Sequence, residues 1–364
     1  MNAERCMFLL SSLAMGGSEK KTVSVANQLT MRGWDIHLGV LGGPQDLLPA
    51  VGVGVNVLQL GRRRRIDFSV VRQLHRYFMA QHITKIWNVN LFSLLYAHLA
   101  GRELSPRLRQ IVSINTTDFY SSYDRMQMLL YAPLIRRAET VIFGSTAQQE
   151  IWVKRYRLDR RKTTVIYNGV DAEHFLALAP TRDLPESSRR LTLGMVGQFR
   201  PEKGHTILLD ALAQLRRNDF AIRLLLVGDG PELTAVQQRV DRMGLSQVVE
   251  FVGRTADVRS YLASMDVFIL PSLAVETFSN AALEAMATGL PVILSNIGGA
   301  AEMIVDGESG FLCPPGDSEA LVSAVRRLMD PGLRKTLGAA ARARVARRFS
   351  IDTMVTRYEE ILRC

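Results

Sequence analysis

Two carboxylates stand on either side of a predicted helix start late in the chain. Glu276 lies in a loop, and Glu284 follows eight positions later inside a helix that Ser279 or Asn280 can cap. The first N–H groups of a helix have no intrahelical partner and carry a partial positive charge, so they attract anions. A sugar diphosphate could place its phosphates on the amides of Phe278, Ser279 and Asn280 and its hydroxyls on the carboxylates. A surface acid and a solvated helical glutamate explain each carboxylate alone, but the pair favours ligand binding.

Two cations follow the predicted strand at residues 191–196. Arg200 and Lys203 belong to the segment GQFRPEKGH, directly after this strand. Open α/β sheets bind ligands at the carboxyl ends of their strands, and two cations there could neutralise a departing diphosphate without a metal. The pattern alone fits a basic turn equally well, and it gains weight beside the Glu276 segment.

A third candidate is the Gly16-Gly17 turn, between a predicted strand at residues 7–11 and a predicted helix at residues 19–32. Glycine has no side chain, so such a turn lets the backbone approach a phosphate closely. Many strand-to-helix turns contain glycine, so this signal is weak on its own.

The elements that must position these residues alternate between strand and helix along the whole chain. This alternation predicts parallel, doubly wound sheets of the α/β class. A polar segment with two prolines, ALAPTRDLPESSRR, is typical of an interdomain linker. We therefore predict an N-terminal domain at residues 1–176, a linker at 177–190, a C-terminal domain at 191–347 and a last helix within 348–364.

Length and composition fit this layout. With 364 residues, 47% hydrophobic and 22% charged, the chain suits two globular domains and not extensive disorder. No apolar run approaches the roughly 20 residues that span a bilayer, and the N-terminal segment is predicted as a first strand, not a signal peptide. The cysteines are few and widely spread, which favours a reducing, cytoplasmic location over a disulfide framework; they are Cys6, Cys313 and Cys364.

The net charge of +10 belongs entirely to the first half of the chain. Residues 1–175 hold 23 Lys and Arg against 13 Asp and Glu, whereas residues 176–364 hold 22 of each. A basic half suggests an anionic partner: a membrane surface, a lipid phosphate or a nucleic acid. Its densest run, RRRR at residues 62–65, precedes a predicted helix, although a solvated loop explains it equally well. The absence of a basic-aromatic platform argues against nucleic acid.

A helix predicted at residues 123–137 could also touch lipid. It carries the apolar residues Met126, Met128, Leu129, Leu130, Tyr131, Leu134 and Ile135. We expect these side chains to pack in the protein core, because core packing is the commoner use of such a helix.

Several metal and cofactor motifs are missing from the sequence. No Asp-x-Asp pair, no G-x-x-x-x-G-K-[ST] phosphate loop and no zinc-like spacing of His and Cys is present. Gly228-Asp229-Gly230 begins like a dinucleotide fingerprint, but Leu233 stands where the third glycine belongs. The sequence therefore predicts neither a metal nor a bound cofactor.

The Glu276-x7-Glu284 run with EAMATGLPVI resembles the donor site of the retaining GT-B glycosyltransferases, glycosyltransferase family 4 in particular. The segments GGSEKKTVSVANQLTMRGWDIHLGVL, VIYNGVDAEHF, VGDGPELTAV and YEEIL fit the family in order, so the likeness covers nearly the whole chain. It implies two Rossmann-like domains facing a cleft, with the last helix crossing back to the N-terminal domain. It also implies that Glu276 meets donor-sugar hydroxyls and that Glu284 holds the ribose. The amides between them would bind the diphosphate together with Arg200 and Lys203.

The resemblance assigns further residues. Gly16 and Gly17 would close on the phosphates, and Arg254 belongs to a segment that lines the base pocket. Many family members carry a histidine after the strand that matches residues 111–114, where it supports the donor sugar. This chain has SINTTDFY there, so Asn115 or Asp118 is the candidate for that support.

We predict a metal-independent, retaining transfer of a sugar from a nucleotide diphosphate to a lipid-linked or cell-envelope polysaccharide acceptor, with UDP favoured over GDP. As the resemblance implies, a phosphate oxygen of the donor accepts the acceptor proton, so no enzyme nucleophile is needed. The basic N-terminal domain would bind the acceptor and the cytoplasmic face of an anionic membrane. The alternatives are an epimerase or hydrolase of the same fold, and a non-catalytic nucleotide-sugar-binding partner.

Overall fold

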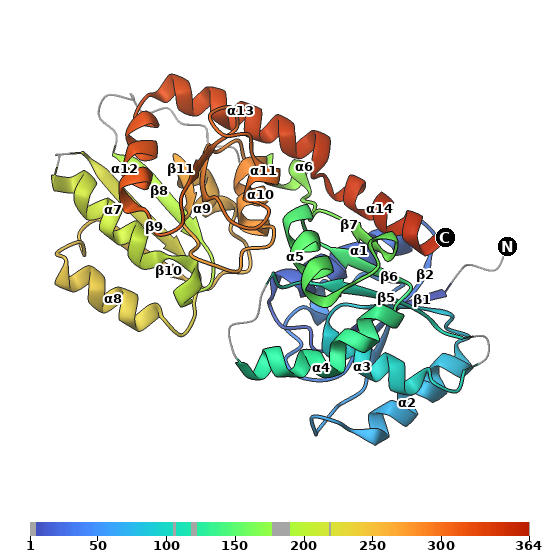
Figure 1. Ribbon diagram of the computed structural model, residues 1–364. Coiled ribbons are helices and arrows are strands. Elements are labelled where there is room, and N and C mark those ends of the chain that lie inside the picture. The colour runs from blue at the N-terminus through green and yellow to red at the C-terminus, as the bar shows by residue number, and fades with distance from the viewer. Residues whose placement is uncertain (1–4, 105–106, 118–121, 177–189, 218–219, 364) are drawn as a thin grey trace. The chain divides into compact units, whose positions relative to one another are not determined.

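The computed structural model describes residues 5–104, 107–117, 122–176, 190–217 and 220–363. The chain divides into two compact units within these ranges: unit 1 comprises residues 1–167 and 354–364, and unit 2 comprises residues 168–353. Figure 1 shows both units, with helices and strands labelled where there is room. Asp118 and residues 177–189 of the predicted linker lie outside the described residues.

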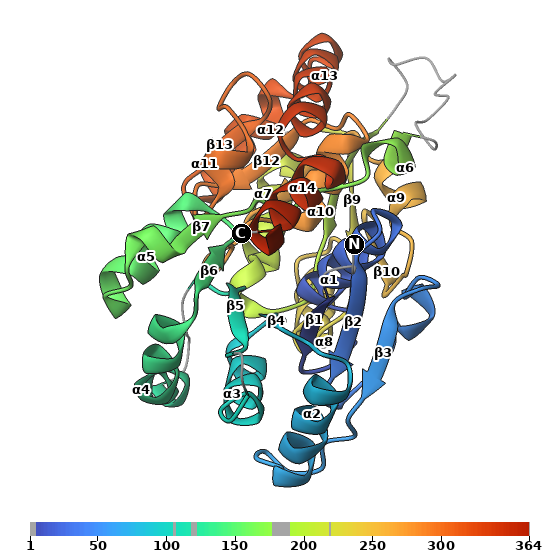
Figure 2. The same ribbon diagram turned by 90° about the vertical axis from the view of Figure 1, so that its right-hand side faces the viewer.

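The described part of unit 1 contains a seven-stranded parallel sheet in the order β3-β2-β1-β4-β5-β6-β7. Figure 2 shows this order, with β3 at one edge and β7 at the other. The central strands are almost continuously buried, as expected where helices cover both faces of a parallel sheet. The strands are β1 Arg5–Leu10, β2 Asp35–Val40, β3 Asn56–Gln59, β4 Lys85–Asn88, β5 Arg109–Ile114, β6 Thr140–Phe143 and β7 Thr163–Val165.

Polar caps start several helices of unit 1. Asp67 accepts a hydrogen bond from the Ser69 amide at the start of α2, and Asn90 and Ser93 form a capping box at α3. Ser145 caps α5, because its side chain accepts a hydrogen bond from the Gln148 amide. The helices are α1 Gly17–Met31, α2 Phe68–Ala80, α3 Leu91–Ala100, α4 Ser122–Arg137 and α5 Thr146–Tyr156, with 3-10 turns η1 Leu48–Ala50 and η2 Arg160–Lys162.

One face of α4 differs from the prediction. Met126, Leu129 and Leu130 have exposed fractions of 59%, 80% and 52%. The expectation of core packing was wrong for these three residues and is confirmed for Met128, Tyr131, Leu134 and Ile135. The helical period places the three exposed residues on the side opposite Met128, Tyr131 and Ile135.

The last helix, α14 (Ile351–Arg363), belongs to unit 1 from Met354 onward. The Tyr358 ring lies on Trp87 with 4.2 Å between ring centroids. Glu359 accepts a hydrogen bond from Arg32 over 2.9 Å, and Lys85 donates to the Leu362 carbonyl. These contacts confirm that the helix crosses back to the N-terminal unit.

The described part of unit 2 contains a six-stranded parallel sheet in the order β10-β9-β8-β11-β12-β13. The strands are β8 Leu191–Val196, β9 Ile222–Val227, β10 Val249–Gly253, β11 Val267–Leu270, β12 Val292–Ser295 and β13 Phe311–Cys313. The helices are α6 Ala172–Leu176, α7 His205–Arg217, α8 Leu233–Arg242, α9 Arg259–Ser264, α10 Asn280–Ala287, α11 Ala300–Met303, α12 Ser318–Arg327 and α13 Pro331–Arg348, with the 3-10 turn η4 Pro201–Lys203.

Candidate active site

The strand order of each sheet reverses once, and open α/β sheets bind ligands at the carboxyl ends of the strands on either side of such a reversal. In unit 2 the reversal lies between β8 and β11, which pair in parallel. The loop after β8 carries Arg200 and Lys203, and the loop after β11 carries Glu276. The sheet therefore brings three predicted site residues to one edge, although Lys203 and Glu276 are 73 positions apart.

Lys203 and Glu276 form an ion pair at this edge. The Lys203 Nζ atom lies 2.7 Å from Glu276 Oε2, and the Ser272 hydroxyl donates to the same oxygen over 2.9 Å. The Lys203 and Glu276 side chains are 23% and 15% exposed, so the pair is partly shielded from water. Ser272 was not singled out from the sequence, and its place just after the strand at residues 267–270 is the signal that could have found it.

Close backbone contacts fix the loop that carries Glu276. Val275 has φ = 51°, a left-handed conformation that costs a β-branched residue on the order of 1–3 kcal/mol. A Cβ atom at Gly298 would overlap the Glu276 carbonyl oxygen, and the Gly299 amide donates to the Thr277 carbonyl over 2.9 Å. The loop after β12 therefore holds the Glu276 backbone in place, and only glycine fits at position 298.

The loop after β8 is tied to the loop after β11 by main-chain contacts. The Leu273 amide donates to the Glu202 carbonyl over 2.7 Å. A Cβ atom at Gly204, which has φ = +72°, would overlap the Pro271 carbonyl oxygen. Lys203 lies between these two contacts, so the backbone sets where its side chain begins.

Arg200 occupies the same loop in a more open environment. Its side chain is 53% exposed, and its guanidinium lies 3.9 Å from the Glu202 carboxylate. Water screens such an exposed pair, so the guanidinium can exchange Glu202 for a ligand phosphate. The structure thus pairs one predicted cation with Glu276 and directs the other toward solvent.

Helix α10 begins at Asn280, and Ser279 is its cap. The Ser279 hydroxyl accepts a hydrogen bond from the Ala282 amide over 3.2 Å, which decides between the two capping residues that the sequence allowed. Glu284 lies one turn after Asn280 and is partly buried. The predicted carboxylates therefore do stand on either side of one helix start.

Phe278 is anchored in unit 2 by both its ring and its backbone. The ring is buried and packs edge-on against Phe349, with 5.2 Å between centroids. The Phe278 carbonyl accepts a hydrogen bond from Asn168 Nδ2 over 2.9 Å. The ring of Phe278 is therefore committed to packing and its carbonyl to Asn168.

The motif that begins like a dinucleotide fingerprint has a packing role. A Cβ atom at Gly228 would overlap the Gly197 carbonyl oxygen, so the turn after β9 lies directly on the loop after β8. In that loop Phe199 stacks on His205 with 4.2 Å between ring centroids. Burial, assisted by the Lys203 charge, lowers the pKa of His205 to about 4. The imidazole is therefore neutral at pH 7 and supports the loop of the two cations.

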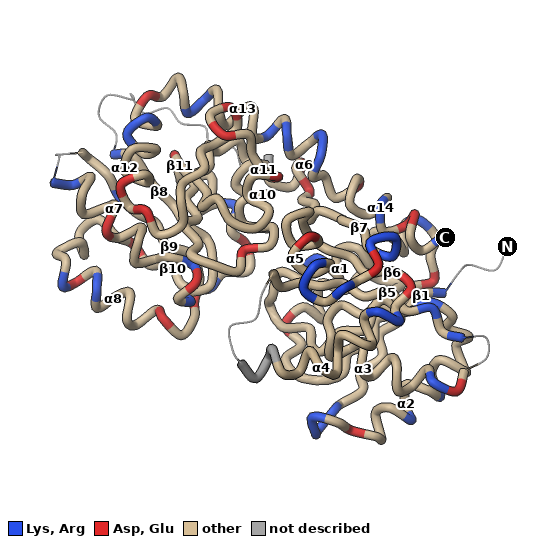
Figure 3. Tube along the Cα trace, in the orientation of Figure 1, with Lys and Arg blue, Asp and Glu red and all other residues tan. Residues whose placement is uncertain are grey.

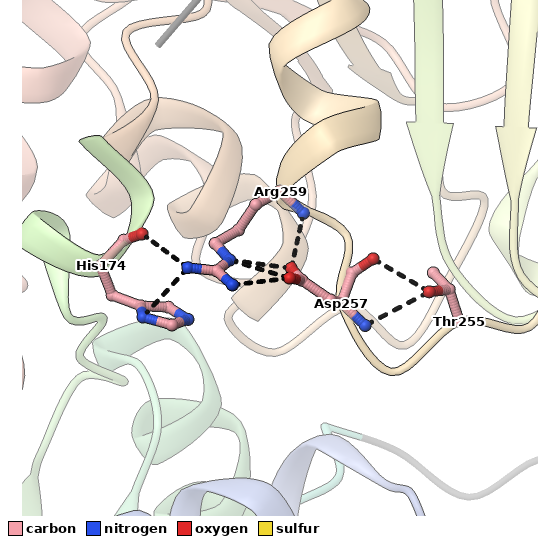
Figure 4. Close-up of polar contacts among 4 residues, drawn as sticks. All are labelled: His174, Thr255, Asp257 and Arg259. Carbon is pink, nitrogen blue, oxygen red and sulfur yellow. Dashed lines mark hydrogen bonds and ion pairs between the residues drawn. The ribbon is translucent and has the colours of Figure 1, made fainter. Parts of the chain in front are cut away.

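Arg254 follows β10 and is exposed. The loop beyond it is fixed by the contacts in Figure 4. Arg259 Nη2 lies 2.7 Å from the Asp257 carboxylate, and Arg259 Nη1 lies 3.4 Å from the His174 carbonyl. Thr255 donates to the Asp257 carbonyl over 2.9 Å. Hydrogen bonds from Arg259 lower the pKa of Asp257 to about 2, so this carboxylate stays ionised and holds the loop that follows Arg254.

The Gly-Gly turn of unit 1 contains a feature that the sequence did not suggest. Gly16 caps α1, and Gly17 is the first residue of that helix. The Glu19 carboxylate lies against Gly16, where a Cβ atom would overlap it, and it accepts a hydrogen bond from Ser18 over 2.8 Å. An acidic group thus occupies the helix start at which a phosphate was predicted, and a bound phosphate requires Glu19 to move.

Asn115 lies directly after β5 and uses both ends of its amide. Its Nδ2 atom donates to the Val89 carbonyl, and its Oδ1 atom accepts from Lys21 Nζ over 3.5 Å. Lys21 was not singled out from the sequence, although the second lysine of GGSEKK stands beside the buried face of a predicted helix. Of the two residues proposed to replace the family histidine, Asn115 is therefore held in place, and Asp118 lies outside the described residues.

Metal ligands do not gather in the part of the chain that the structure describes: no three His, Cys, Asp or Glu side chains there form a group that could hold an ion. Every helix in the same ranges is too short or too polar to cross a bilayer. The strand ends of unit 2 that carry Lys203 and Glu276 present cations, carboxylates and the N–H donors of a helix start. Such groups suit an anionic ligand with hydroxyl groups.

Two family models match the two halves of the chain. The model described as Glycosyltransferase Family 4 matches residues 15–174, and the model described as Glycosyl transferases group 1 matches residues 190–331. Between them they include every residue proposed for the site. The chain belongs to glycosyltransferase family 4.

Individual relatives and solved structures agree with this membership. N-acetyl-alpha-D-glucosaminyl L-malate synthase of Bacillus anthracis is 26% identical over 363 residues, covering 96% of this chain and 94% of that protein. Phosphatidyl-myo-inositol mannosyltransferase of Mycobacterium leprae is 25% identical and covers 92% of this chain and 89% of its own. The crystal structure of Anabaena HepE in complex with UDP and glucose superposes with a TM-score of 0.83 and 26% identity over 98% of both chains. The two parallel-sheet units are therefore those of the GT-B fold, and the protein is a glycosyltransferase of glycan, cell-envelope or polysaccharide biosynthesis.

Proposed function

We propose that this family 4 enzyme transfers a sugar from a nucleotide diphosphate to a lipid-linked or cell-envelope polysaccharide acceptor, with retention of configuration and without a metal. The observation that carries the proposal is the Lys203–Glu276–Ser272 contact at the strand-order reversal of unit 2. A cation that could bind phosphate and a carboxylate that could accept sugar hydroxyls lie side by side there, and the same loop leads into the start of α10.

The division of labour in this site follows from its geometry. Oε2 of Glu276 already accepts two hydrogen bonds, whereas Oε1 accepts none from the described residues, so Oε1 is the oxygen that can take a sugar hydroxyl. Lys203 keeps further donors for a phosphate oxygen, because an ammonium has three. Arg200 and the α10 amides would add positive charge around the leaving diphosphate.

The proposed reaction needs no enzyme nucleophile. The bond between the sugar C1 and the diphosphate oxygen breaks while a bond from C1 to the acceptor oxygen forms on the same face. The acceptor proton passes to the departing phosphate oxygen, which leaves the nucleoside diphosphate and the glycosylated acceptor. The protein contributes positioning and electrostatic stabilisation of the leaving group.

The relatives support a UDP-sugar over a GDP-sugar as donor. Anabaena HepE has been solved with UDP and glucose and with UDP-glucose. The protein chain in the complex with UDP and glucose is 26% identical to this one, and the chain in the complex with UDP-glucose is 25% identical. The acceptor class rests on relatives named for capsular polysaccharide and phosphatidyl-myo-inositol.

The test is transfer by purified Glu276→Ala and Glu276→Gln variants, with Glu250→Gln, an exposed acid on β10, as control. A screen of UDP- and GDP-sugars against glycan and lipid acceptors, with and without EDTA, would identify the donor and any metal requirement. The anomeric configuration of the product would be assigned by NMR. We expect both Glu276 variants to lose roughly 100- to 1,000-fold in kcat, the size of losses seen when a transition-state contact is removed.

Transfer by Glu276→Ala at the wild-type rate would place the site elsewhere. Donor turnover without any transfer product would favour a hydrolase or epimerase, and donor binding without turnover would favour a non-catalytic partner. Inversion of the anomeric centre would exclude the retaining mechanism.

We also propose that unit 1 binds the cytoplasmic face of an anionic membrane. Arg63, Arg64 and Arg65 are exposed, and so are Ile66 in the same loop and Phe68 at the start of α2. Figure 3 shows this basic run beside α2. Basic and apolar side chains together suit a surface of anionic lipid.

Helix α4 extends this surface. Its exposed residues Leu129 and Leu130 were expected in the core. Burial raises the pKa of Tyr131 on the same helix, and the charge of Arg65 partly offsets that rise, so Arg65 acts on α4 electrostatically. Arg62 does not take part, because its guanidinium lies over the Phe92 ring, 4.7 Å from the ring centre.

A further inference from the structure

The sheet of unit 1 has a strand-order reversal of its own, between β1 and β4. Asn90, just after β4, donates to the hydroxyl of Ser11, just after β1, over 2.9 Å. The carboxyl ends of these strands are where a sheet of this kind binds its ligand. In unit 2 the cation Lys203 lies at the carboxyl ends of the strands on either side of the reversal. Unit 1 has a cation at the equivalent place.

That cation is Lys21, in the first turns of α1. Its Nζ atom lies 3.5 Å from Oδ1 of Asn115, which follows β5. Asn115 in turn donates from Nδ2 to the carbonyl of Val89, which follows β4. Lys21 therefore reaches from the helix after β1 across the end of β4 to the loop after β5, over the reversal point.

The loop that carries Asn115 is fixed by hydrogen bonds from helix α5. Gln148 of α5 donates to the Ile114 and Thr116 carbonyls over 2.9 and 2.8 Å, and Trp152 donates to the Thr116 carbonyl over 3.0 Å. Because the Nδ2 atom of Asn115 is engaged, its Oδ1 atom is fixed toward Lys21. The arrangement gives the ammonium one neutral acceptor, the amide oxygen of Asn115.

The environment of Lys21 favours an anionic ligand. Burial lowers the pKa of Lys21 to about 8, although the Glu19 carboxylate partly offsets this effect. An ammonium has three donors, and among the described residues this one has a single hydrogen-bond acceptor, at 3.5 Å. An ammonium with unused donors gains interaction energy when a phosphate binds.

We infer that Lys21 binds a phosphate group of the substrate at the strand-order reversal of unit 1. The inference rests on the proposed function and names a contact from the N-terminal unit that no motif assigned. The phosphate belongs either to the nucleotide diphosphate or to a lipid phosphate of the acceptor. Both sources present phosphate oxygens that share a negative charge, and the experiment distinguishes the two sources.

The experiment compares four full-length proteins: wild type, Lys21→Met, Lys21→Arg and Lys20→Met. Lys20 is the exposed neighbour on the same helix, so its variant removes the same charge without touching the contact. Calorimetric titrations would use UDP as the nucleotide probe and dihexanoyl phosphatidic acid below its micelle concentration as the lipid-phosphate probe. Circular dichroism and thermal melting would establish that each variant is folded.

We expect Lys21→Met to weaken one of the two probes at least about tenfold, which corresponds to about 1.4 kcal/mol. Lys21→Arg should retain most of the affinity, and Lys20→Met should bind like wild type. Weakened UDP binding assigns the phosphate to the donor, and weakened lipid binding assigns it to the acceptor.

Unchanged affinity of Lys21→Met for both probes, or equal losses in Lys20→Met, would overturn the inference. So would a wild-type protein that binds neither probe. The proposed function is judged separately by transfer in the Glu276 variants, so UDP binding that is insensitive to Lys21 would leave it standing.

Discussion

At the scale of single residues, Glu276 is defined by its two donors. Lys203 and Ser272 both bind Oε2, over 2.7 and 2.9 Å. This arrangement fixes the rotamer of the carboxylate and leaves Oε1 to face a ligand. Ser272 is 1% exposed, and its hydroxyl donates to Glu276. Under the proposed function it would be a positioning residue, because it would act through Glu276 and not on the substrate.

We expect Ser272→Ala to lower kcat by roughly tenfold, because a hydrogen bond to a charged group is worth about 1.5–3 kcal/mol and the carboxylate loses its fixed orientation. The KM for the donor should change less than kcat, since Lys203 still holds Glu276. Steady-state kinetics and thermal melting of the variant would measure both effects.

Ser113→Ala is the matched control, because Ser113 is a buried hydroxyl in unit 1 that accepts a hydrogen bond from Trp87 over 2.7 Å. It should lower the melting temperature and leave kcat of the folded protein unchanged. Equal kcat in wild type and Ser272→Ala would show that Ser272 does not position Glu276.

At the scale of elements, three loops at one edge of the unit 2 sheet hold each other through their backbones. The loop after β8 contacts the loop after β11 at Gly204, and the loop after β12 contacts it at Gly298. Between these contacts Val275 keeps a left-handed conformation. The site is therefore rigid because main chains touch where side chains would not fit.

We expect Gly298→Ala to reduce kcat by more than about tenfold, because the new Cβ overlaps the Glu276 carbonyl oxygen and displaces that loop. Gly307→Ala separates this effect from backbone strain, since Gly307 also has a positive φ, +76°, but nothing lies within 4 Å of its Cβ position. Both variants pay the left-handed penalty of about 1–2 kcal/mol, and both should melt at lower temperature.

Transfer rates per folded molecule would decide the matter. Only Gly298→Ala should lose activity, and equal rates in the two variants would mean that the Gly298 contact does not set the geometry of the site.

At the scale of the whole molecule, the charge excess is confined to the first half of the sequence, which holds 23 basic against 13 acidic residues. The basic run at 62–65, the exposed Phe68 and the exposed face of α4 all belong to unit 1. Helix α14 adds the end of the chain to the same unit, where Glu359 pairs with Arg32. We therefore propose that the basic unit 1 binds the membrane and the acceptor, and that unit 2 binds the nucleotide.

We expect Arg63→Ser/Arg64→Ser to weaken binding to vesicles of phosphatidylcholine and phosphatidylglycerol by roughly 30-fold, since each basic residue near such a surface contributes about 1 kcal/mol. Vesicle flotation at several salt concentrations would measure this, and added salt should weaken wild-type binding. Leu129→Ser should reduce the part of the binding that persists at high salt.

Arg216→Ser/Arg217→Ser removes the same charge from an exposed site at the end of α7 in unit 2 and should bind like wild type. Equal loss in both double variants would show a response to net charge alone, and salt-insensitive binding would contradict an electrostatic surface.

Local signals in the sequence determined much of this protein. Buried strand runs, helix caps such as Ser279 and the order of the elements predict two parallel α/β sheets, because these features depend on the period of the hydrophobic pattern and on a few neighbouring residues. The carboxylates around the start of α10 were found for the same reason.

Only the tertiary structure decided which distant groups meet. Strand order is not written in any local pattern, so the pairing of β8 with β11 had to be seen before Lys203, Ser272 and Glu276 could be joined. The contact of Lys21 with Asn115 likewise depends on three strand ends lying together, and the exposed face of α4 depends on how much of that helix the sheet can cover. Contacts between residues far apart in sequence arise from chain folding as a whole, and for that reason the sequence named the chemistry of the site while the fold set its geometry.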